Sequence, residues 1–316
     1  MGASTRLTKR LMPSVSLIIP THSRPHLLPR AVESALAAGT DVEVVVVDDA
    51  STDDTAEVCR AMKGINYVRL DHNQGVAGAR NVGVLTSSAE YIAFLDDDDL
   101  RLPGSLDLQL AMLRNTPDAA LIYGQALIGG ATDRFAGDRY PQPCPEGDVF
   151  WQLVTQNFIP SGSVLFRRSC LFSTGLLDRS IAGIDDWDLW VRVAALYPVA
   201  ALDQPVVIWR RPAPDSDQSS ARAVEMVALS TRQFRRHWMR MSRAAQAPPV
   251  VRRRAVRRFS QNMASHLVSE ALRSLSCGQV MRANHCVVAA LRNHSHGIAW
   301  RVLRKLSDRR QSSVSG

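Results

Sequence analysis

Short apolar runs alternate with amphipathic segments through the first hundred residues. Residues 15–19, 42–47, 67–69 and 91–95 are mostly apolar or β-branched, which predicts four buried strands. The intervening segments 28–36, 51–64 and 75–85 carry helical spacing, helix-capping residues or a terminating glycine. Strands that alternate with helices predict an α/β fold with a mostly parallel sheet flanked by helices.

The later part of the chain has a mixed pattern and then becomes helical. We expect a helix over 105–114, a strand over 119–123, a Pro- and Gly-rich loop over 129–147 and a helix over 184–196. Apolar residues spaced by three or four over 256–275 and 280–291 predict a helical hairpin. The Pro-, Asp- and Ser-rich segment 211–220 marks a boundary. The expected division is a tail (1–13), a main domain (14–212) and a basic helical extension (213–316).

Charge is unevenly distributed along the chain. The net charge is +8, but the residues from Arg222 onward include 19 basic and three acidic ones, so the first 221 residues carry −8. Two interpretations of the basic extension stay open: a solvated helical face, or attraction to an anionic membrane surface or acceptor. Nucleic acid is not an expected partner, because the extension has few aromatic residues and no recognisable reading motif.

The sequence also gives an expectation about the cellular compartment. No apolar run approaches the roughly 20 residues that span a bilayer, and the N-terminus shows no cleavable signal pattern. The five cysteines are scattered and form no CxxC pair, so neither a disulfide framework nor a zinc site is indicated. We expect a cytoplasmic protein.

Polar clusters follow three of the predicted strands. They are Pro20-Thr21, Asp48-Asp49 and the run of four aspartates at 96–99. In sheets of this kind, ligands bind beyond the carboxyl ends of the strands. The three clusters therefore predict one functional site at that edge of the sheet.

The aspartate run at 96–99 indicates a divalent cation. Four adjacent carboxylates repel one another, and Mg²⁺ or Mn²⁺ is held by carboxylates that share it with substrate phosphates. If the segment is extended, Asp96 and Asp98 face one site, and Asp97 and Asp99 face away. Asp99 could equally be a helix cap or a ligand.

Other candidate residues keep two interpretations each. Asp48 is assigned to the strand-to-helix turn, whereas Asp49 could accept a hydrogen bond from a base or ribose. Arg80 lies within the glycine-containing segment 73–83, which matches no standard phosphate-loop pattern, so it is either a diphosphate contact or a structural ion pair. Asp185 and Asp188 could simply complement the dipole of their helix, or a neighbouring negative group could raise the pKa of such a carboxylate and suit it to act as a general base.

Taken together, the motifs resemble those of family 2 glycosyltransferases of the GT-A fold. The matching segments are VSLIIPT (15–21), VDDASTD (47–53), NQG with ARNVG (73–75 and 79–83), FLDDDD (94–99) and DDWDLW (185–190). They cover roughly residues 14–210. Each motif alone is weakly specific, but five in this order are strongly specific.

The resemblance implies a GT-A type, Rossmann-like fold and an inverting transfer of sugar from a nucleotide-diphosphate donor. It places the metal, Mn²⁺ or Mg²⁺, on Asp98 and the catalytic base on Asp186, although the family usually writes Glu where this chain has Asp185. The implied donor-binding residues are Pro20, Thr21, Arg24, Asp49, Gly75, Arg80, Asp96 and Asp97. Among them, Pro20 and Thr21 would line the base pocket, Asp49 would bind the base, and Asp96 would lie near the ribose.

One departure from the family bears on processivity. Processive members carry transmembrane helices and a Gln-x-x-Arg-Trp motif, whereas this chain has Gln233 and Trp238 one residue further apart. We interpret that similarity as coincidence and expect transfer of a single sugar. The acceptor would be a glycan or a lipid-linked molecule in polysaccharide, lipopolysaccharide or glycoconjugate synthesis, with peripheral contact at the cytoplasmic face of the membrane.

Two other functions compete with this one. A sugar-nucleotide pyrophosphorylase shares a nucleotide-binding α/β sheet, but it needs a Gly- and Lys/Arg-rich loop after the first strand, and residues 21–25 lack those glycines. A non-catalytic nucleotide-sugar-binding module would keep the fold without turnover, and the intact carboxylate set argues against it.

Overall fold

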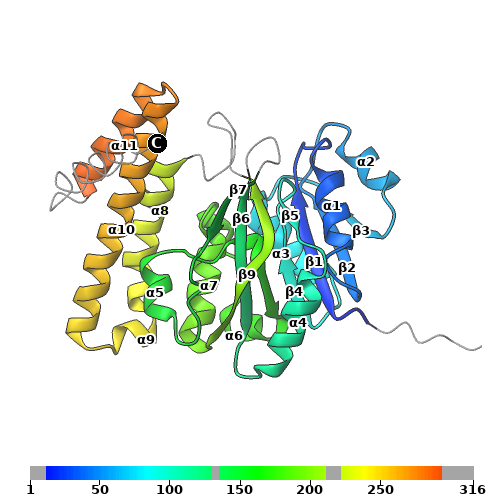
Figure 1. Ribbon diagram of the computed structural model, residues 1–316, viewed down its shortest axis with the longest axis horizontal. Helices are drawn as coiled ribbons and strands as arrows, with labels where there is room; N and C mark the ends of the chain where they lie inside the picture. The colour runs from blue at the N-terminus through cyan, green and yellow to red at the C-terminus, as the bar shows by residue number, and fades with distance from the viewer. Residues whose placement is uncertain (1–11, 130–134, 211–221, 294–316) are drawn as a thin grey trace, which may run out of the picture. The chain divides into compact units, whose positions relative to one another are not determined.

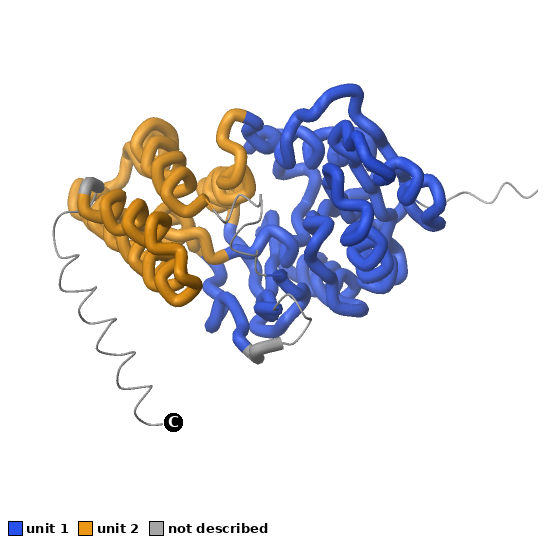
Figure 2. Tube along the Cα trace, turned by 90° about the horizontal axis from the view of Figure 1, so that it is seen from above, with its two compact units in different colours: residues 1–147, 159–179, 198–210 blue, residues 148–158, 180–197, 211–316 orange. Residues whose placement is uncertain are grey.

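The computed structural model describes residues 12–129, 135–210 and 222–293 (Figure 1). The boundary predicted at 211–220 and nearly all of the expected N-terminal tail lie outside these residues. The chain divides into two compact units (Figure 2). The first contains Met1–Gly147, Ile159–Arg179 and Pro198–Arg210, and the second contains Asp148–Phe158, Ser180–Tyr197 and Arg211–Gly316.

The first unit is built on one mixed sheet, in the order β3-β2-β1-β4-β8-β6-β9-β5 with β7 on β6. The strands are β1 (Val15–Thr21), β2 (Val42–Asp48), β3 (Ile65–Arg69), β4 (Tyr91–Phe94), β5 (Leu100–Arg101), β6 (Leu121–Gly129), β7 (Phe135–Tyr140), β8 (Val164–Arg167) and β9 (Val199–Arg210). β3, β2, β1 and β4 are parallel, and so are β6 and β9. The α/β fold is confirmed, with antiparallel pairings by β5, β7 and β8 that the sequence did not predict.

The register of the parallel strands brings their polar ends to one edge. Thr21 at the end of β1 pairs with Asp48 at the end of β2, and Ile18 pairs with Phe94 at the end of β4. Every residue of β1 and β4 is buried. The sheet therefore fixes the segments after these strands close together, as expected.

The first unit also contains five α-helices among its described residues. They are α1 (Leu28–Leu36), α2 (Thr55–Ala61), α3 (Gly75–Thr86), α4 (Ser105–Asn115) and the short α6 (Leu171–Thr174). α3 approaches β1 very closely, because a Cβ added to Gly83 would lie 2.3 Å from Cγ2 of Ile18. A glycine at this position lets α3 hold Arg80 near the strand ends.

The second unit is helical. It contains α5 (Phe150–Thr155), α7 (Asp185–Leu196), α8 (Ala223–Arg236), α9 (Ser242–Ala245), α10 (Pro249–Ser276) and α11 (Val280–Asn293). α10 and α11 form the predicted hairpin, joined through Gly278 at φ 75° and by an ion pair of 2.9 Å between Arg282 and Glu270. α5 and α7, which we placed in the main domain from the sequence, group with the C-terminal helices.

Several predicted elements differ from those observed. The segment 129–147, predicted as a loop, contains β7, and the strands β5, β8 and β9 were not predicted. Residues 95–99 form a turn rather than an extended segment, closed by the amide of Asp99 donating to the carbonyl of Asp96 at 3.1 Å.

Among the residues that the structure describes, none of the helices combines the length and apolarity that crossing a membrane requires.

Candidate functional site

The turn after β4 gathers three of the four aspartates. One carboxylate oxygen from each of Asp96, Asp98 and Asp99 lies within 4.8 Å of the others. The assignment of Asp99 as a ligand stays a prediction, whereas the expectations that it faces away from Asp96 and Asp98 or caps a helix are wrong. The reason is the tight turn, which breaks the alternation that an extended segment would impose.

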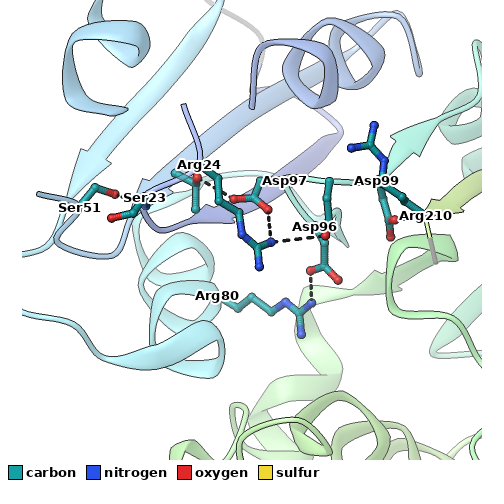
Figure 3. Close-up of polar contacts among 10 residues, drawn as sticks. Ser23, Arg24, Ser51, Arg80, Asp96, Asp97, Asp99 and Arg210 are labelled. Atoms are coloured by element: carbon teal, nitrogen blue, oxygen red, sulfur yellow. Dashed lines mark hydrogen bonds and ion pairs between the residues drawn. The ribbon is translucent and has the colours of Figure 1, made fainter. Parts of the chain in front are cut away.

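Asp97 points instead toward the end of β1. Its Oδ2 accepts the hydroxyl of Thr21 at 2.8 Å, and its Oδ1 accepts Arg24 at 2.9 Å. The same guanidinium nitrogen of Arg24 lies 3.4 Å from Oδ2 of Asp98. Arg24 thus joins Asp97 to Asp98. Figure 3 shows Arg24 beside Asp97, which anchors the turn to the strand.

Arg80 reaches the cluster from α3. It donates to Oδ1 of Asp96 at 2.6 Å, and its guanidinium lies over the ring of Phe94 at 5.3 Å. Its side chain is 4% exposed, whereas that of Asp96 is 40% exposed. Arg80 therefore forms a structural ion pair, and Asp96 is the member of the run most open to a ligand (Figure 3).

The ionised forms of Asp98 and Asp99 are disfavoured where these carboxyl groups lie. Burial and the neighbouring charges of Asp96 and Asp97 raise the pKa of Asp98 to about 7. Burial and nearby carboxylates also raise the pKa of Asp99 well above its usual value, although its Oδ1 accepts the amide of Arg210 at 2.8 Å. Within the described part of the chain, Arg24 and Arg80 form ion pairs with aspartates of this run, and the site favours an additional cation.

The donor set suits a hard divalent cation. Mg²⁺ and Mn²⁺ prefer carboxylate oxygens, and Asp96, Asp98 and Asp99 offer three of them in one place. A cation there would also stabilise the ionised form of Asp98, whose pKa is otherwise raised. The residues present therefore fit the metal that the sequence predicted.

The two aspartates after β2 have different environments. Asp48 is buried and accepts the amide of Ser51 at 2.8 Å and the hydroxyl of Tyr67 at 2.8 Å, so it serves the turn as interpreted. Asp49 accepts the amides of Gln74 at 2.7 Å and of Gly75 at 2.8 Å. Its carboxylate therefore holds the start of α3, the helix that carries Arg80.

The remaining candidates of the first unit, Pro20 and Gly75, lie in β1 and at the start of α3. Pro20 is buried within β1 and pairs with Val47, and Gly75 begins α3 with φ 74°. Neither contacts the aspartate cluster through a described hydrogen bond. Their expected roles toward the nucleotide stay predictions.

Asp186 lies in the second unit, in the first turn of α7. It is half-buried, and its Oδ1 accepts the amide of Trp187 at 2.6 Å. Asp185 is only 3% exposed, and its Oδ1 accepts the amide of Gly183 at 3.0 Å. Of the two carboxylates, Asp186 is the one more open to a substrate.

Sequence reasoning missed two groups of polar residues. Arg101 is fully buried, with its guanidinium on Gln109 at 2.6 Å and on the carbonyl of Val164 at 2.8 Å. Gln233 and Trp238 both donate to Asp188, for which the sequence left open a role at the helix dipole or as a general base. Nothing in the periodicity of the chain signals contacts between residues so far apart.

Part of the chain matches a known protein family. Residues 16–172 match the family described as Glycosyl transferase family 2. This segment contains every strand-end cluster described above.

Curated relatives are similar over part of the chain. Succinoglycan biosynthesis protein ExoU of Rhizobium meliloti is 34% identical over 203 residues, 57% of this chain and 57% of that protein. The GalNAc(5)-diNAcBac-PP-undecaprenol beta-1,3-glucosyltransferase of Campylobacter jejuni is 33% identical over 135 residues, 40% of this chain and 43% of that protein. The chain spans between 26% and 67% of the length of the curated relatives compared.

Solved structures share the fold at low sequence identity. TarS residues 1–349 of S. aureus, in complex with UDP-GlcNAc, has a TM-score of 0.52 at 15% identity, covering 87% of this chain and 91% of that one. The mannosyltransferase PcManGT of Pyrobaculum calidifontis, in complex with GDP-Man and Mn²⁺, has a TM-score of 0.55 at 18% identity, covering 91% and 88%.

Proposed function

Because the chain belongs to glycosyltransferase family 2, we propose that it transfers a single sugar, with inversion, from a nucleotide-diphosphate donor to an acceptor hydroxyl. The observation that carries this proposal is the aspartate cluster after β4, where three carboxylates converge beside two arginines. The nucleotide sugars bound to TarS and PcManGT support the choice of donor class. The product would be a polysaccharide, lipopolysaccharide or other glycoconjugate.

In this proposal the first unit binds the donor. Asp98, with Asp96 and Asp99, would hold Mn²⁺ or Mg²⁺. When bound, the ion neutralises charge on the departing nucleoside diphosphate. Arg80 orients Asp96 through their ion pair and adds positive charge close to the same place. Pro20, Thr21, Arg24, Asp49, Gly75 and Asp97 complete the donor-binding region that we propose.

Asp186 is the proposed catalytic base. It takes the proton from the acceptor hydroxyl while that oxygen bonds to the anomeric carbon and the bond from that carbon to the diphosphate breaks. Attack from the face opposite the leaving group inverts the configuration. The greater exposure of Asp186 than of Asp185 supports this choice.

The metal and donor assignment is tested by thermal unfolding with a panel of nucleotide sugars. A correct donor raises the Tm only when Mn²⁺ is present, by the equivalent of about 2.7 kcal/mol at a donor concentration of about 100 times its Kd. Asp98→Asn should lose this effect. Asp118→Asn, at an exposed position in the first unit, should keep it. Equal stabilisation of both variants would refute the metal site.

The catalytic assignment is tested by Asp186→Asn. Loss of a general base should lower kcat by about 10²- to 10⁴-fold while donor binding persists. Near-normal transfer by the variant would refute the base. A non-catalytic binding module would show donor binding but no transfer in the unmodified protein, and a pyrophosphorylase would release pyrophosphate from a nucleoside triphosphate and a sugar 1-phosphate.

The acceptor side of the proposal concerns the basic extension. Arg252, Arg253, Arg254, Arg257 and Arg258 are exposed on α10, whereas Ala255 and Phe259 of the same turns are buried. The name of the Campylobacter relative includes a polyprenyl diphosphate acceptor. We propose that these arginines contact an anionic membrane surface at its cytoplasmic face, near a glycan or lipid-linked acceptor.

A further inference from the structure

Asp188 has an unusual set of partners for a residue in a first helical turn. It is 3% exposed. Its Oδ1 accepts both the side-chain amide of Gln233 at 2.7 Å and the indole N–H of Trp238 at 2.8 Å. Its Oδ2 accepts Arg192, one turn along α7, at 2.7 Å. Two of the three donors therefore come from the C-terminal helices rather than from α7 itself.

Aromatic packing reinforces the same contact. The ring centroids of Trp238 and Trp187 are 4.8 Å apart. The ring of Phe259 in α10 also packs against Trp187, with 6.5 Å between the two ring centroids. The indole N–H of Trp187 donates to the carbonyl of Leu153 in α5 at 2.7 Å. The residue directly after Asp186 is thus enclosed by α5, α10 and the 3₁₀ turn Trp238–Arg240.

These contacts converge on the turn that carries the proposed base. Asp186, Trp187 and Asp188 are consecutive. The hydrogen bonds and packing of Trp187 and Asp188 therefore fix the backbone to which the side chain of Asp186 is attached. A half-buried Asp186 has only a short side chain with which to compensate for any movement of that backbone. Catalytic groups require positioning to within a fraction of an ångström, usually by neighbours locked in turn by hydrogen bonds and packing.

We propose that Gln233 and Trp238 are positioning residues for sugar transfer, which hold Asp188 and thereby set the place of Asp186. The proposal rests on the function proposed above. It gives the C-terminal extension a role in the chemistry, in addition to any role in contacting a surface. Both side chains donate to the same carboxylate oxygen, a contact that the spacing of the two residues in the sequence does not reveal.

The test compares Gln233→Leu and Trp238→Phe, which remove each donor while keeping most of the side-chain volume. Both should lower kcat by about 10- to 100-fold, because small displacements of a catalytic group have effects of this size. The KM for donor and its Mn²⁺-dependent binding should stay within about twofold, since the donor-binding residues belong to the first unit. A combined Asp186→Asn/Trp238→Phe variant should be no slower than Asp186→Asn.

A matched control separates positioning from general stability. Arg282→Gln removes one donor from another buried carboxylate, Glu270, in the same unit, while Arg273 still pairs with it. We expect a lower Tm and an unchanged kcat. The inference is wrong if the control loses as much kcat as Trp238→Phe, or if Trp238→Phe and Gln233→Leu keep normal kcat. It fails alone, with the proposed function intact, if only Asp186→Asn loses activity.

Discussion

The carboxylates of the cluster differ in whether they stabilise the fold or favour binding of a cation. Asp97 is held by Thr21 and Arg24, whereas Asp98 and Asp99 are buried among like charges. Burying an ionised group without sufficient compensation destabilises the folded chain. The arrangement is therefore typical of a cation-binding site, in which the folded protein is less stable without the cation than with it.

Asp98 gives a pH-dependent prediction in the absence of divalent cations. Its pKa is raised to about 7 in the folded protein, so the folded state binds more protons than the unfolded state between about pH 4 and pH 7. Stability should fall as the pH rises through this window and change little above it. Asp98→Asn should remove this contribution and stabilise the metal-free protein at pH 8, by up to about 4 kcal/mol.

The measurement is urea unfolding of both proteins at pH 5 and pH 8 with a chelator present. Loss of the contact with Arg24 will offset part of the gain. Asp118→Asn, at an exposed position, should follow the unmodified protein at both pH values. A variant no more stable than the unmodified protein at pH 8 would contradict a strained Asp98.

At the level of helices and strands, the sequence predicted elements with a clear period and missed those without one. Helix 28–36 has apolar residues on a single face, and it forms over those residues. β8 has four residues, which is too few for a period, and β9 contains Pro205, a residue that normally argues against a strand. The direction of β8 depends on partners distant in the chain, so local pattern could not reveal its antiparallel pairing.

The candidate site was predictable to the same degree. Residues that follow strands, such as Thr21, Asp49 and Asp96, could be placed at one edge because parallel strands end there. The direction of each aspartate side chain could not, because a turn rather than an extended segment follows β4. The contacts of Asp188 depend on helices that begin more than thirty residues later, and no periodicity encodes them.

The start of α3 provides a prediction at the scale of one element. Asp49→Ala should destabilise the protein by about 1–2 kcal/mol, because two backbone amides of the helix start lose their acceptor. It should also weaken donor binding, since α3 carries Arg80. The matched control is Asp54→Ala, at the N-cap of α2, where the side chain makes no capping hydrogen bond. Urea unfolding should show a much smaller change for the control, and equal losses would contradict the capping role of Asp49.

Over the whole molecule, the boundary between acidic and basic sequence does not coincide with the boundary between the two compact units. The first 221 residues carry −8 and include the donor-site candidates, and the remainder carries +16. The second compact unit nevertheless contains both the basic helices and α7 with Asp186. Removing the C-terminal extension would therefore also remove the donors to Asp188, so truncation cannot test surface binding alone.

Point variants on α10 test the membrane contact without this complication. Replacing Arg252, Arg253, Arg254, Arg257 and Arg258 by Gln should abolish co-sedimentation with vesicles containing phosphatidylserine, because each basic residue near an anionic surface contributes about 1 kcal/mol. Binding by the unmodified protein should weaken as salt increases, since the Debye length falls from about 10 Å at 0.1 M to about 3 Å at 1 M. Neutralising Arg60 and Lys63, exposed in and after α2, should have little effect. If the five-arginine variant bound such vesicles as well as the unmodified protein, the exposed face of α10 would be a solvated helix surface and the acceptor would have to be recognised elsewhere.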